Sequence, residues 1–311
     1  MISDTLRAQI CSSAELSFLM EVHDGFSATI AERTGFEGLW VSATSIACSL
    51  GYCYADEAPW NQVKSIIERI VGSTELPVLA DGDIVLRSVN SGVIIAHELR
   101  CCGAAGLALE DSSGPRAMHV LREQHREANL QKFCSRVRAV KDAVKDDLVL
   151  VVCLEAPKDE CGMEETLLRA HDYARAGADA ILLHSCKDAV DGIVSYLQAC
   201  RSPLPIVVIP AKDDRMLLSA PLSVPLSAII WANHSMHGAI DATRNVRCRL
   251  GIGESTASIE RGVAIVDDLI EVLMYDELAR GRGRWCREDN VSSTQEVHRD
   301  LRGGPSCPGR S

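Results

Sequence analysis

Three carboxylates of the sequence follow short apolar runs, where their spacing could bring them together around a cation. Asp81 and Asp83 follow the run LPVLA, and Glu110 ends the run AAGLALE. Carboxylates that converge at one site repel one another unless a cation lies among them. Hard oxygen ligands with room for water suit Mg²⁺, whereas a His/Cys cluster would suit zinc. The three residues therefore predict a magnesium site.

Polar residues follow the other apolar runs of the chain in the same way. An aspartate at such a position also serves as a helix N-cap, and this role stays an alternative for Asp24 and Asp111. A cluster that recurs run after run is harder to attribute to capping alone. The residues at the run ends are Glu21, His23, Asp24, Ser42, Asp81, Asp83, Glu110, Asp111, Glu155, His184, Lys212, Asn233 and His234.

The elements that position these residues read as alternating strands and helices. Continuous apolar runs alternate with segments whose apolar residues recur every three or four positions, which indicates a parallel sheet covered by helices. Eight runs favour an α/β fold of the closed (β/α)₈ barrel type, with its active site at the carboxyl ends of the strands. No GxGxxG turn follows the first run, which argues against a dinucleotide fold. The runs span residues 16–22, 37–42, 76–83, 104–111, 148–156, 179–185, 205–211 and 227–234.

Composition agrees with one large acidic enzyme domain. The 311 residues are 47% hydrophobic and carry a net charge of −11, which argues against a nucleic-acid partner. The N-terminus lacks a secretory leader, and no apolar run reaches the roughly 20 residues that cross a bilayer, so we expect a cytoplasmic protein without a membrane partner. We expect the barrel over residues 1–285, with a long helical stretch over about 256–280. The Arg-, Gly- and Ser-rich residues 286–311 predict a disordered tail, whose deletion should leave activity unchanged.

The thirteen cysteines form no CxxC pair, so neither a disulfide framework nor a metal knuckle is expected. Most should be reduced and packed as small hydrophobic residues. Cys153 and Cys186 are exceptions, because both lie near the expected mouth of the barrel.

Six segments of the chain resemble the phosphoenolpyruvate mutase/isocitrate lyase superfamily, and among its members the mutases most. They are MEVHDGFSA (20–28), LWVSATS (39–45), LADGD (79–83), LED (109–111), AGADAILLHS (176–185) and IIWANH (229–234). The resemblance covers about residues 10–280. It implies an (α/β)₈ barrel whose eighth helix is exchanged between subunits, giving homodimers or homotetramers. It also implies a Mg²⁺ cofactor and a small-molecule enolpyruvate or 2-oxo acid substrate.

The resemblance also implies roles for individual residues. Asp81 would bind Mg²⁺ directly, with Asp83 and Glu110 acting through bound water. Backbone N–H groups at a strand-to-helix turn suit an anion, so the substrate carboxylate is expected there, and His184 would contact the migrating or leaving group. The residues expected around the substrate are Ser42, Ala43 and Thr44 at its carboxylate, with Trp40 and Asn233 shaping the pocket.

The departures from the mutase pattern fall on one part of the expected site. The run DGDIVLRSVN (81–90) lacks the glycines of DxDTGYGN, and Tyr54 stands where an acidic residue is expected, with Asp56 two residues on. The run EDSSGPRAMHV (110–120) replaces EDKxxPKxNS, with Met118 at the asparagine position and Arg116 left as a substitute for the second lysine. The fifth strand reads VCLEA where the family has ARVEA, so Cys153 takes the position of the arginine while Glu155 is retained.

These departures leave the half of the site that binds Mg²⁺, carboxylate and the enol oxygen, and alter the half that recognises the moving group. We therefore expect a mutase, an isomerase that interconverts phosphoenolpyruvate and 3-phosphonopyruvate, or arsenoenolpyruvate and arsonopyruvate, in natural-product biosynthesis. The sulfur of Cys153 would suit a soft element. A C–C or C–P lyase or hydrolase is the second hypothesis, although the lyase motif KKCGH is absent. A non-catalytic metabolite-binding paralogue is the third, and the retained carboxylates argue against it.

Overall fold

The computed structural model describes residues 2–11, 16–53, 55–82, 89–111, 129–156, 160–184, 190–199, 204–210 and 226–273. The chain divides into two compact units, residues 1–245 and 246–311. The tail expected over residues 286–311 lies outside the described residues. None of the described helices is both long enough and apolar enough to cross a membrane.

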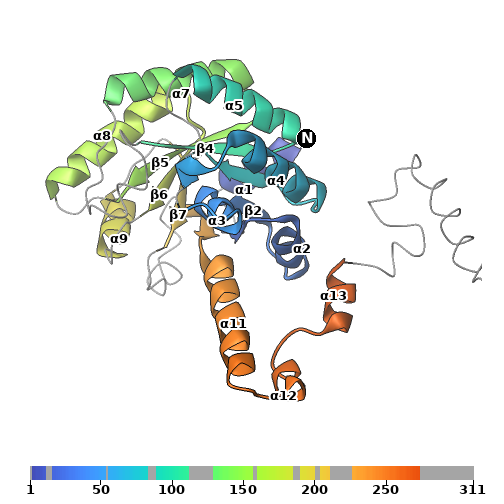
Figure 1. The fold of residues 1–311 in the computed structure, drawn as a ribbon. Coiled ribbons are helices and arrows are strands. Elements are labelled where there is room, and N and C mark those ends of the chain that lie inside the picture. The colour runs from blue at the N-terminus through green and yellow to red at the C-terminus, as the bar shows by residue number, and fades with distance from the viewer. Residues whose placement is uncertain are drawn as a thin grey trace, which may run out of the picture. The chain divides into compact units, whose positions relative to one another are not determined.

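Eight parallel strands close into a barrel in the order in which they occur in the chain (Figure 1). Each predicted run coincides with one strand, although β8 begins one residue before its run, and β1 closes the barrel against β8 through the pairs from Ser17↔Ala228 to Met20↔Trp231. The predicted (β/α)₈ barrel is thus confirmed. The strands are β1 Ser17–Val22, β2 Gly38–Val41, β3 Val78–Asp81, β4 Gly106–Glu110, β5 Val149–Glu155, β6 Ala180–His184, β7 Ile206–Ile209 and β8 Leu226–Trp231.

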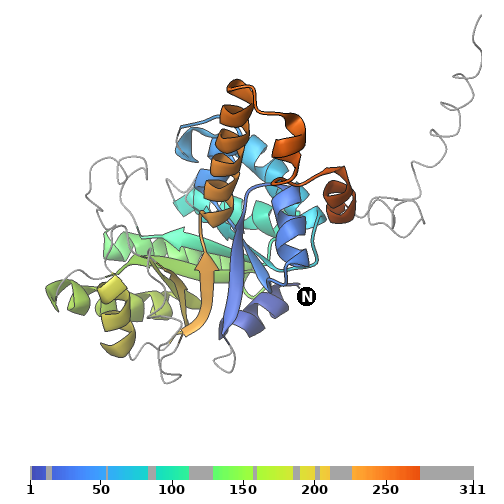
Figure 2. The same ribbon diagram turned by 90° about the horizontal axis from the view of Figure 1, so that it is seen from below.

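Helices follow the strands and surround the barrel (Figures 1 and 2). Asp24 caps the helix after β1, because its Oδ1 accepts the N–H of Ser27 at 2.7 Å, so the N-cap alternative is correct for this residue. The helices of the first unit are α1 Ile2–Cys11, α2 Gly25–Arg33, α3 Ala43–Ser49, the 3₁₀ turn η1 Ala55–Glu57, α4 Trp60–Gly72, α5 Val89–Cys102, α7 Leu130–Val144, α8 Glu160–Ala176 and α9 Val190–Ala199. Helix α11, His234–Gly251, continues across the boundary into the second unit.

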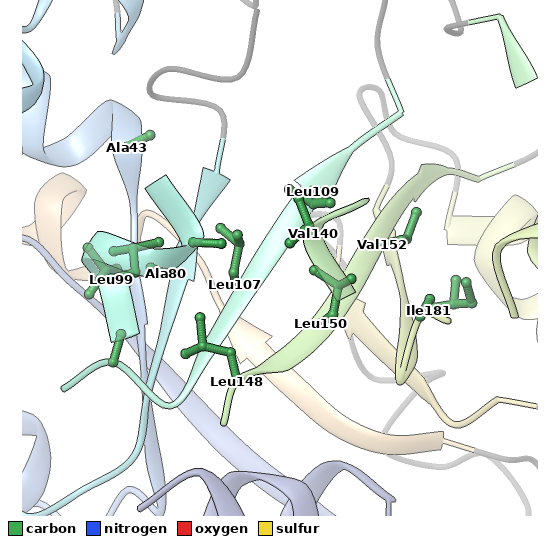
Figure 3. Packing of buried hydrophobic residues seen from close by; sticks show 14 of the residues in the cluster. Ala43, Ala80, Leu99, Leu107, Leu109, Val140, Leu148, Leu150, Val152 and Ile181 are labelled. Atoms are coloured by element: carbon green, nitrogen blue, oxygen red, sulfur yellow. The ribbon is translucent and has the colours of Figure 1, made fainter. Parts of the chain in front are cut away.

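Alternate residues of each strand face the helices or the inside of the barrel. In β4, Leu107 and Leu109 pack in one cluster with Val140 of α7 (Figure 3). Ala108 belongs to a second cluster inside the barrel. A strand turns successive side chains to opposite faces, so Glu110 continues the inner row and Asp111 the outer row. The same alternation fixes the direction of every residue at the strand ends.

Helix α1 covers the amino ends of the strands. Its residues Leu6 and Ile10 are fully buried among the inner side chains. A Cβ at Gly106 would lie 2.7 Å from Leu6 Cδ2 and 2.9 Å from the carbonyl oxygen of Val149, so glycine at this position leaves room for the helix. The inner row is thus filled from below by α1, as a packed barrel core requires.

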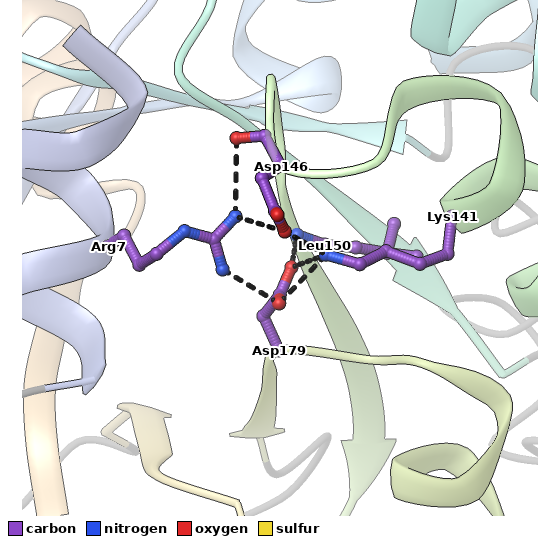
Figure 4. Close-up of polar contacts among 5 residues, drawn as sticks. All are labelled: Arg7, Lys141, Asp146, Leu150 and Asp179. Carbon is purple, nitrogen blue, oxygen red and sulfur yellow. Dashed lines mark hydrogen bonds and ion pairs between the residues drawn. The ribbon is translucent and has the colours of Figure 1, made fainter. Parts of the chain in front are cut away.

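A polar network fastens α1 to the barrel, as Figure 4 shows. Asp179, just before β6, forms ion pairs with Arg7 Nη1 at 2.8 Å and with Lys141 Nζ at 2.9 Å. Its Oδ2 also accepts the backbone N–H of Leu150 at 2.8 Å. One carboxylate therefore joins α1, α7 and two neighbouring strands at the end of the barrel opposite the expected site.

In the second unit, the stretch expected to be helical over residues 256–280 contains two short helices. Helix α12 spans Thr256–Glu260 and helix α13 spans Val266–Leu273, with residues 261–265 between them outside any helix. The backbone N–H of Ile265 donates to Asp268 Oδ2 at 2.7 Å, a contact that starts a new helix rather than continuing the previous one. Residues 274–280 lie outside the described range.

Candidate active site at the carboxyl ends of the strands

The inner rows of the strands bring six polar residues to the mouth of the barrel. Each lies in the last two residues of its strand or directly after it. Four of the six, Glu21, Ser42, Asp81 and His184, expose no more than 7% of their surface. A buried polar group without a hydrogen-bonding partner destabilises the fold, so we expect these side chains to bind one another or a ligand. The six are Glu21, Ser42, Asp81, Glu110, Glu155 and His184.

Glu110 and His184 touch on the inner face of the barrel, across the single strand β5. His184 Nε2 lies 3.1 Å from Glu110 Oε1, and both side chains are about nine-tenths buried. Strand register explains the meeting, because β5 lies between them with Glu110 opposite Cys153 and Glu155 opposite His184. The backbone N–H of Ala156 donates to the carbonyl of His184 at 2.7 Å and fixes the end of β6. The predicted water-mediated metal ligand and the predicted group-contacting histidine therefore form one unit.

Asp81 lies beside the turn expected to bind the substrate carboxylate. The backbone N–H of Ala43 donates to Asp81 Oδ2 at 3.4 Å, and Ser42 Oγ accepts the N–H of Ser45 as the N-cap of α3. Asp81 pairs in register with Ala108, so Glu110 stands two residues further along the neighbouring strand. The predicted cation site and the predicted anion site thus adjoin.

The donor set that the structure describes fits a hard cation. Asp81 and Glu110 offer carboxylate oxygens from adjacent strands on the inner face, and carboxylates are the usual protein ligands of Mg²⁺. Within the described residues, no group of three or more His, Cys, Asp and Glu side chains is arranged to hold a metal ion. The third predicted ligand, Asp83, lies outside those residues.

Cys153 faces inward, directly beside Glu110 in the strand register. It is 4% exposed and packs in the inner cluster with Val151 and Leu182. Trp40, 3% exposed, belongs to the same cluster, two residues before Ser42 on the same inner row. The position where the family resemblance implies an arginine is therefore filled here by a small buried side chain.

One buried carboxylate of the mouth, Glu21, is a run-end residue for which the sequence predicts no specific role. Its Oε1 lies 3.2 Å from His23 Nδ1, and its Oε2 accepts the backbone N–H of Met236 at 3.3 Å in the first turn of α11. The hydrogen bond from Glu21 raises the pKa of His23 above its ordinary value, although burial opposes the shift. Two ionisable residues spaced two apart at a strand end share a face, and this spacing is the signal that could have revealed the pair.

The remaining predicted residues divide between exposed positions and positions outside the description. Thr44 is exposed in the first turn of α3, and Asn233 is exposed just before α11 with a left-handed φ of 66°. Cys102 lies on α5, where burial and Glu68 raise the pKa of its thiol to about 11, so it stays protonated at neutral pH. Outside the description lie Tyr54, Asp83, Arg116, Met118, Cys186, Lys212 and the side chain of Asp56.

The sequence that forms this barrel, with its carboxylates and histidine at the mouth, also matches a known protein family. A model of the family described as phosphoenolpyruvate phosphomutase matches residues 6–249. The chain belongs to the phosphoenolpyruvate phosphomutase family. The phosphoenolpyruvate phosphomutase of Tetrahymena pyriformis is 33% identical over 268 residues, which cover 86% of this chain and 89% of the relative.

The family also has relatives with a different chemistry. The phosphonopyruvate hydrolase of a Variovorax species is 26% identical over 282 residues, which cover 89% of this chain and 96% of that enzyme. A crystal structure of phosphonopyruvate hydrolase in complex with oxalate and Mg²⁺ superposes with a TM-score of 0.80 at 23% identity, covering 90% of this chain and 97% of that one. The chain is thus an enzyme of the phosphoenolpyruvate mutase/isocitrate lyase superfamily, and its fold is that of the phosphoenolpyruvate phosphomutase family.

Proposed function

We propose that the chain is a Mg²⁺-dependent mutase that moves a phosphoryl or arsenic group between the enol oxygen and C3 of an enolpyruvate. In the phosphorus reaction, the bond between the enol oxygen and phosphorus breaks, a bond between C3 and phosphorus forms, and the enol becomes the ketone of 3-phosphonopyruvate. No other reactant enters or leaves. The observation that carries the proposal is the buried contact between His184 and Glu110 beside Asp81, in a chain that is 33% identical to a phosphomutase.

The residues of the mouth divide the binding of such a substrate among them. Ser42 and the backbone N–H groups of Ala43 and Thr44 face the 2-carboxylate of the enolpyruvate. His184 donates from its ring to the oxygens of the moving group, while Glu110 orients that ring. Glu155, at the end of β5, adds a further carboxylate, and the family resemblance implies that Arg116 supplies a cation to the moving group. When bound at Asp81, Asp83 and Glu110, Mg²⁺ supplies positive charge that stabilises the developing enolate.

The identity of the moving group turns on Cys153. A phosphoryl group in transfer spreads charge over three oxygens, and losing one arginine from such a site costs about 2–4 kcal/mol of transition-state stabilisation. Cys153 gives no cation there, but it places a polarisable sulfur on the inner face beside Glu110. This residue supports an arsenic analogue as the substrate that the altered half of the site accepts.

Hydrolysis of the C–P bond is the second candidate, and the same residue favours it. A mutase must hold the moving group until it bonds again, whereas a hydrolase passes it to water. The missing arginine weakens that hold, and a phosphonopyruvate hydrolase is among the relatives at 26% identity. A lyase acting on a C–C bond of a 2-oxo acid and a non-catalytic metabolite-binding paralogue are the remaining outcomes.

The test is ³¹P NMR of the full chain with Mg²⁺ and 3-phosphonopyruvate, which runs the mutase reaction downhill. We expect a phosphoenolpyruvate signal. Inorganic phosphate would instead establish the hydrolase. An unchanged spectrum, with Mg²⁺ and oxalate still bound in calorimetry, would exclude phosphate as the moving group, and arsonopyruvate then replaces phosphonopyruvate in the same assay. Turnover of neither compound would leave the metabolite-binding reading.

We further propose that the enzyme is a homodimer or homotetramer assembled through its C-terminal helices. None of the described side chains of α11 is buried, and α11 exposes Ile240 and Leu250. Helix α13 exposes Val266, Leu269 and Ile270. Exposed apolar residues on a helix mark a contact surface, and a second copy of this chain is the partner that the family resemblance implies. Light scattering should give at least twice the chain mass, and Leu269→Glu with Ile270→Glu should lower it.

A further inference from the structure

We infer that Arg169 and Tyr173 of α8 are positioning residues for Glu110, which they hold through its neighbour Asp111. The part of this inference that concerns Mg²⁺ rests on the proposed function. The part that concerns the backbone of β4 does not.

The two carboxylates at the end of β4 point to opposite sides of the barrel wall. Glu110 continues the inner row to meet His184, and Asp111 turns outward toward α8. The backbone N–H of Asp111 donates to the carbonyl of Cys153 at 3.2 Å, so the chain is still paired with β5 at this point. Because one peptide joins the two residues, whatever fixes the side chain of Asp111 also limits rotation at Glu110.

Arg169 and Tyr173 both donate to one oxygen of Asp111. Its Oδ2 accepts Arg169 Nη1 at 2.9 Å and the hydroxyl of Tyr173 at 2.5 Å, and it is only 1% exposed. Arg169 Nη1 also donates to the Tyr173 hydroxyl at 3.3 Å, so the three groups close a triangle. Charge-assisted bonds of this kind, shielded from water, are the stronger ones in proteins.

The donors are themselves fixed by their surroundings. Arg169 Nε donates to Glu165 Oε1 at 2.8 Å, one turn earlier on α8. Tyr173 is fully buried, and its ring meets that of Phe133 on α7 edge-on, with centroids 5.0 Å apart. Burial, followed by the charge of Asp111, raises the pKa of Tyr173, so its hydroxyl remains a donor at all working pH values. The outer layer of α7 and α8 thus reaches the inner face through Asp111.

The consequence concerns the cation ligand. A carboxylate that binds a metal, directly or through water, must be held to within a fraction of an ångström, and residues behind the ligands commonly alter metal affinity 10–100-fold when replaced. Losing the Tyr173 hydroxyl removes one donor to Asp111 without removing the buried charge of Arg169. We therefore expect a looser β4 end and a weaker cation, with the fold retained.

The experiment compares Tyr173→Phe with Tyr196→Phe in the full chain. Tyr196 on α9 is also fully buried, so both variants lose a hydroxyl from the same hydrophobic cluster. Calorimetry with MgCl₂ alone, without substrate, should show a Kd raised at least threefold in Tyr173→Phe and changed less than twofold in Tyr196→Phe. Hydrogen exchange of the peptide over residues 106–111 should be at least threefold faster in Tyr173→Phe than in Tyr196→Phe.

The outcomes distinguish failure of the positioning role of α8 from failure of the proposed Mg²⁺ dependence. Equal Mg²⁺ affinities in the two variants, with unchanged exchange at residues 106–111, would overturn the inference whatever the catalytic activity. If the unaltered chain binds no Mg²⁺, the cofactor of the proposed function is refuted, and exchange alone then decides whether α8 holds the end of β4. Faster exchange supports the positioning role, and equal exchange refutes it.

Discussion

His184 Nε2 lies 3.1 Å from Glu110 Oε1 although 74 residues separate the two in the chain. The contact crosses β5 on the inner face of the barrel, where both side chains are nearly buried. Glu110 therefore has two roles within reach, as an oxygen ligand for a cation and as the group that orients the histidine ring.

Replacing this carboxylate should remove both roles at once. We expect Glu110→Gln to lower turnover about 10²–10⁴-fold, the range typical for loss of one positioned acid or base, and to weaken Mg²⁺ binding. Initial rates of phosphonopyruvate consumption by ³¹P NMR measure the effect. Glu164→Gln, an exposed position on α8, is the control and should keep the full rate. A Glu110→Gln enzyme with more than half of the original rate would contradict the assignment.

The sulfur of Cys153 should matter for one element and not for the other. Cys153→Ala keeps a small apolar side chain on the inner face, so we expect phosphonopyruvate turnover to stay within about threefold of the original rate. Arsonopyruvate turnover should fall at least tenfold, which corresponds to a loss of about 1.4 kcal/mol of transition-state stabilisation. Cys134→Ala controls for loss of a buried thiol, because Cys134 lies on α7 outside the barrel. Equal loss with both substrates would show that Cys153 acts through packing alone.

The network beneath the barrel should govern stability and leave chemistry untouched. Asp179→Asn removes the charge that pairs with Arg7 and Lys141, and we expect unfolding to become easier by about 3 kcal/mol, as for other largely buried pairs that lose one partner. Asp146→Asn is the matched control, because Asp146 pairs with the same two cations but is 86% exposed. Urea denaturation distinguishes them. Comparable midpoints in the two variants would show that burial of Asp179 adds nothing.

The pair at the end of β1 should make stability depend on pH. The pKa of His23 is raised in the folded chain, chiefly by its hydrogen bond to Glu21 and further by the charges of Glu21 and Asp24. A raised folded pKa stabilises the fold fully below the unfolded value near 6.5, and this contribution is lost as pH rises through the folded value. Wild type should therefore lose more of its Tm between pH 5.5 and 8.5 than His23→Gln does.

The exposed His171 on α8 provides the comparison for this measurement. His171→Gln should retain the pH dependence of wild type. If all three proteins shift in parallel, the Glu21–His23 pair does not stabilise the fold.

The strands and the barrel could be predicted because each depends on local pattern. Every apolar run coincides with a strand to within a few residues, and Asp24 caps α2 through a contact only three residues away. The contacts of Arg169 and Tyr173 with Asp111 could not be predicted. The two residues lie 58 and 62 residues after Asp111 in the chain, and no local sequence pattern links them to it. The stretch over 256–280 misled for a local reason, since its apolar spacing continues through residues 261–265 where the backbone leaves the helix.

The placement of α1 beneath the strands bears on how such an enzyme diverges. Leu6, Ile10 and Asp179 stabilise the barrel at the amino ends of the strands, opposite the candidate active site. Replacements at the opposite rim, where Cys153 lies, can then accumulate without loosening the packing around α1. A lineage built in this way can exchange the element it handles while inheriting its architecture unchanged, and a laboratory selection for new chemistry has the same freedom.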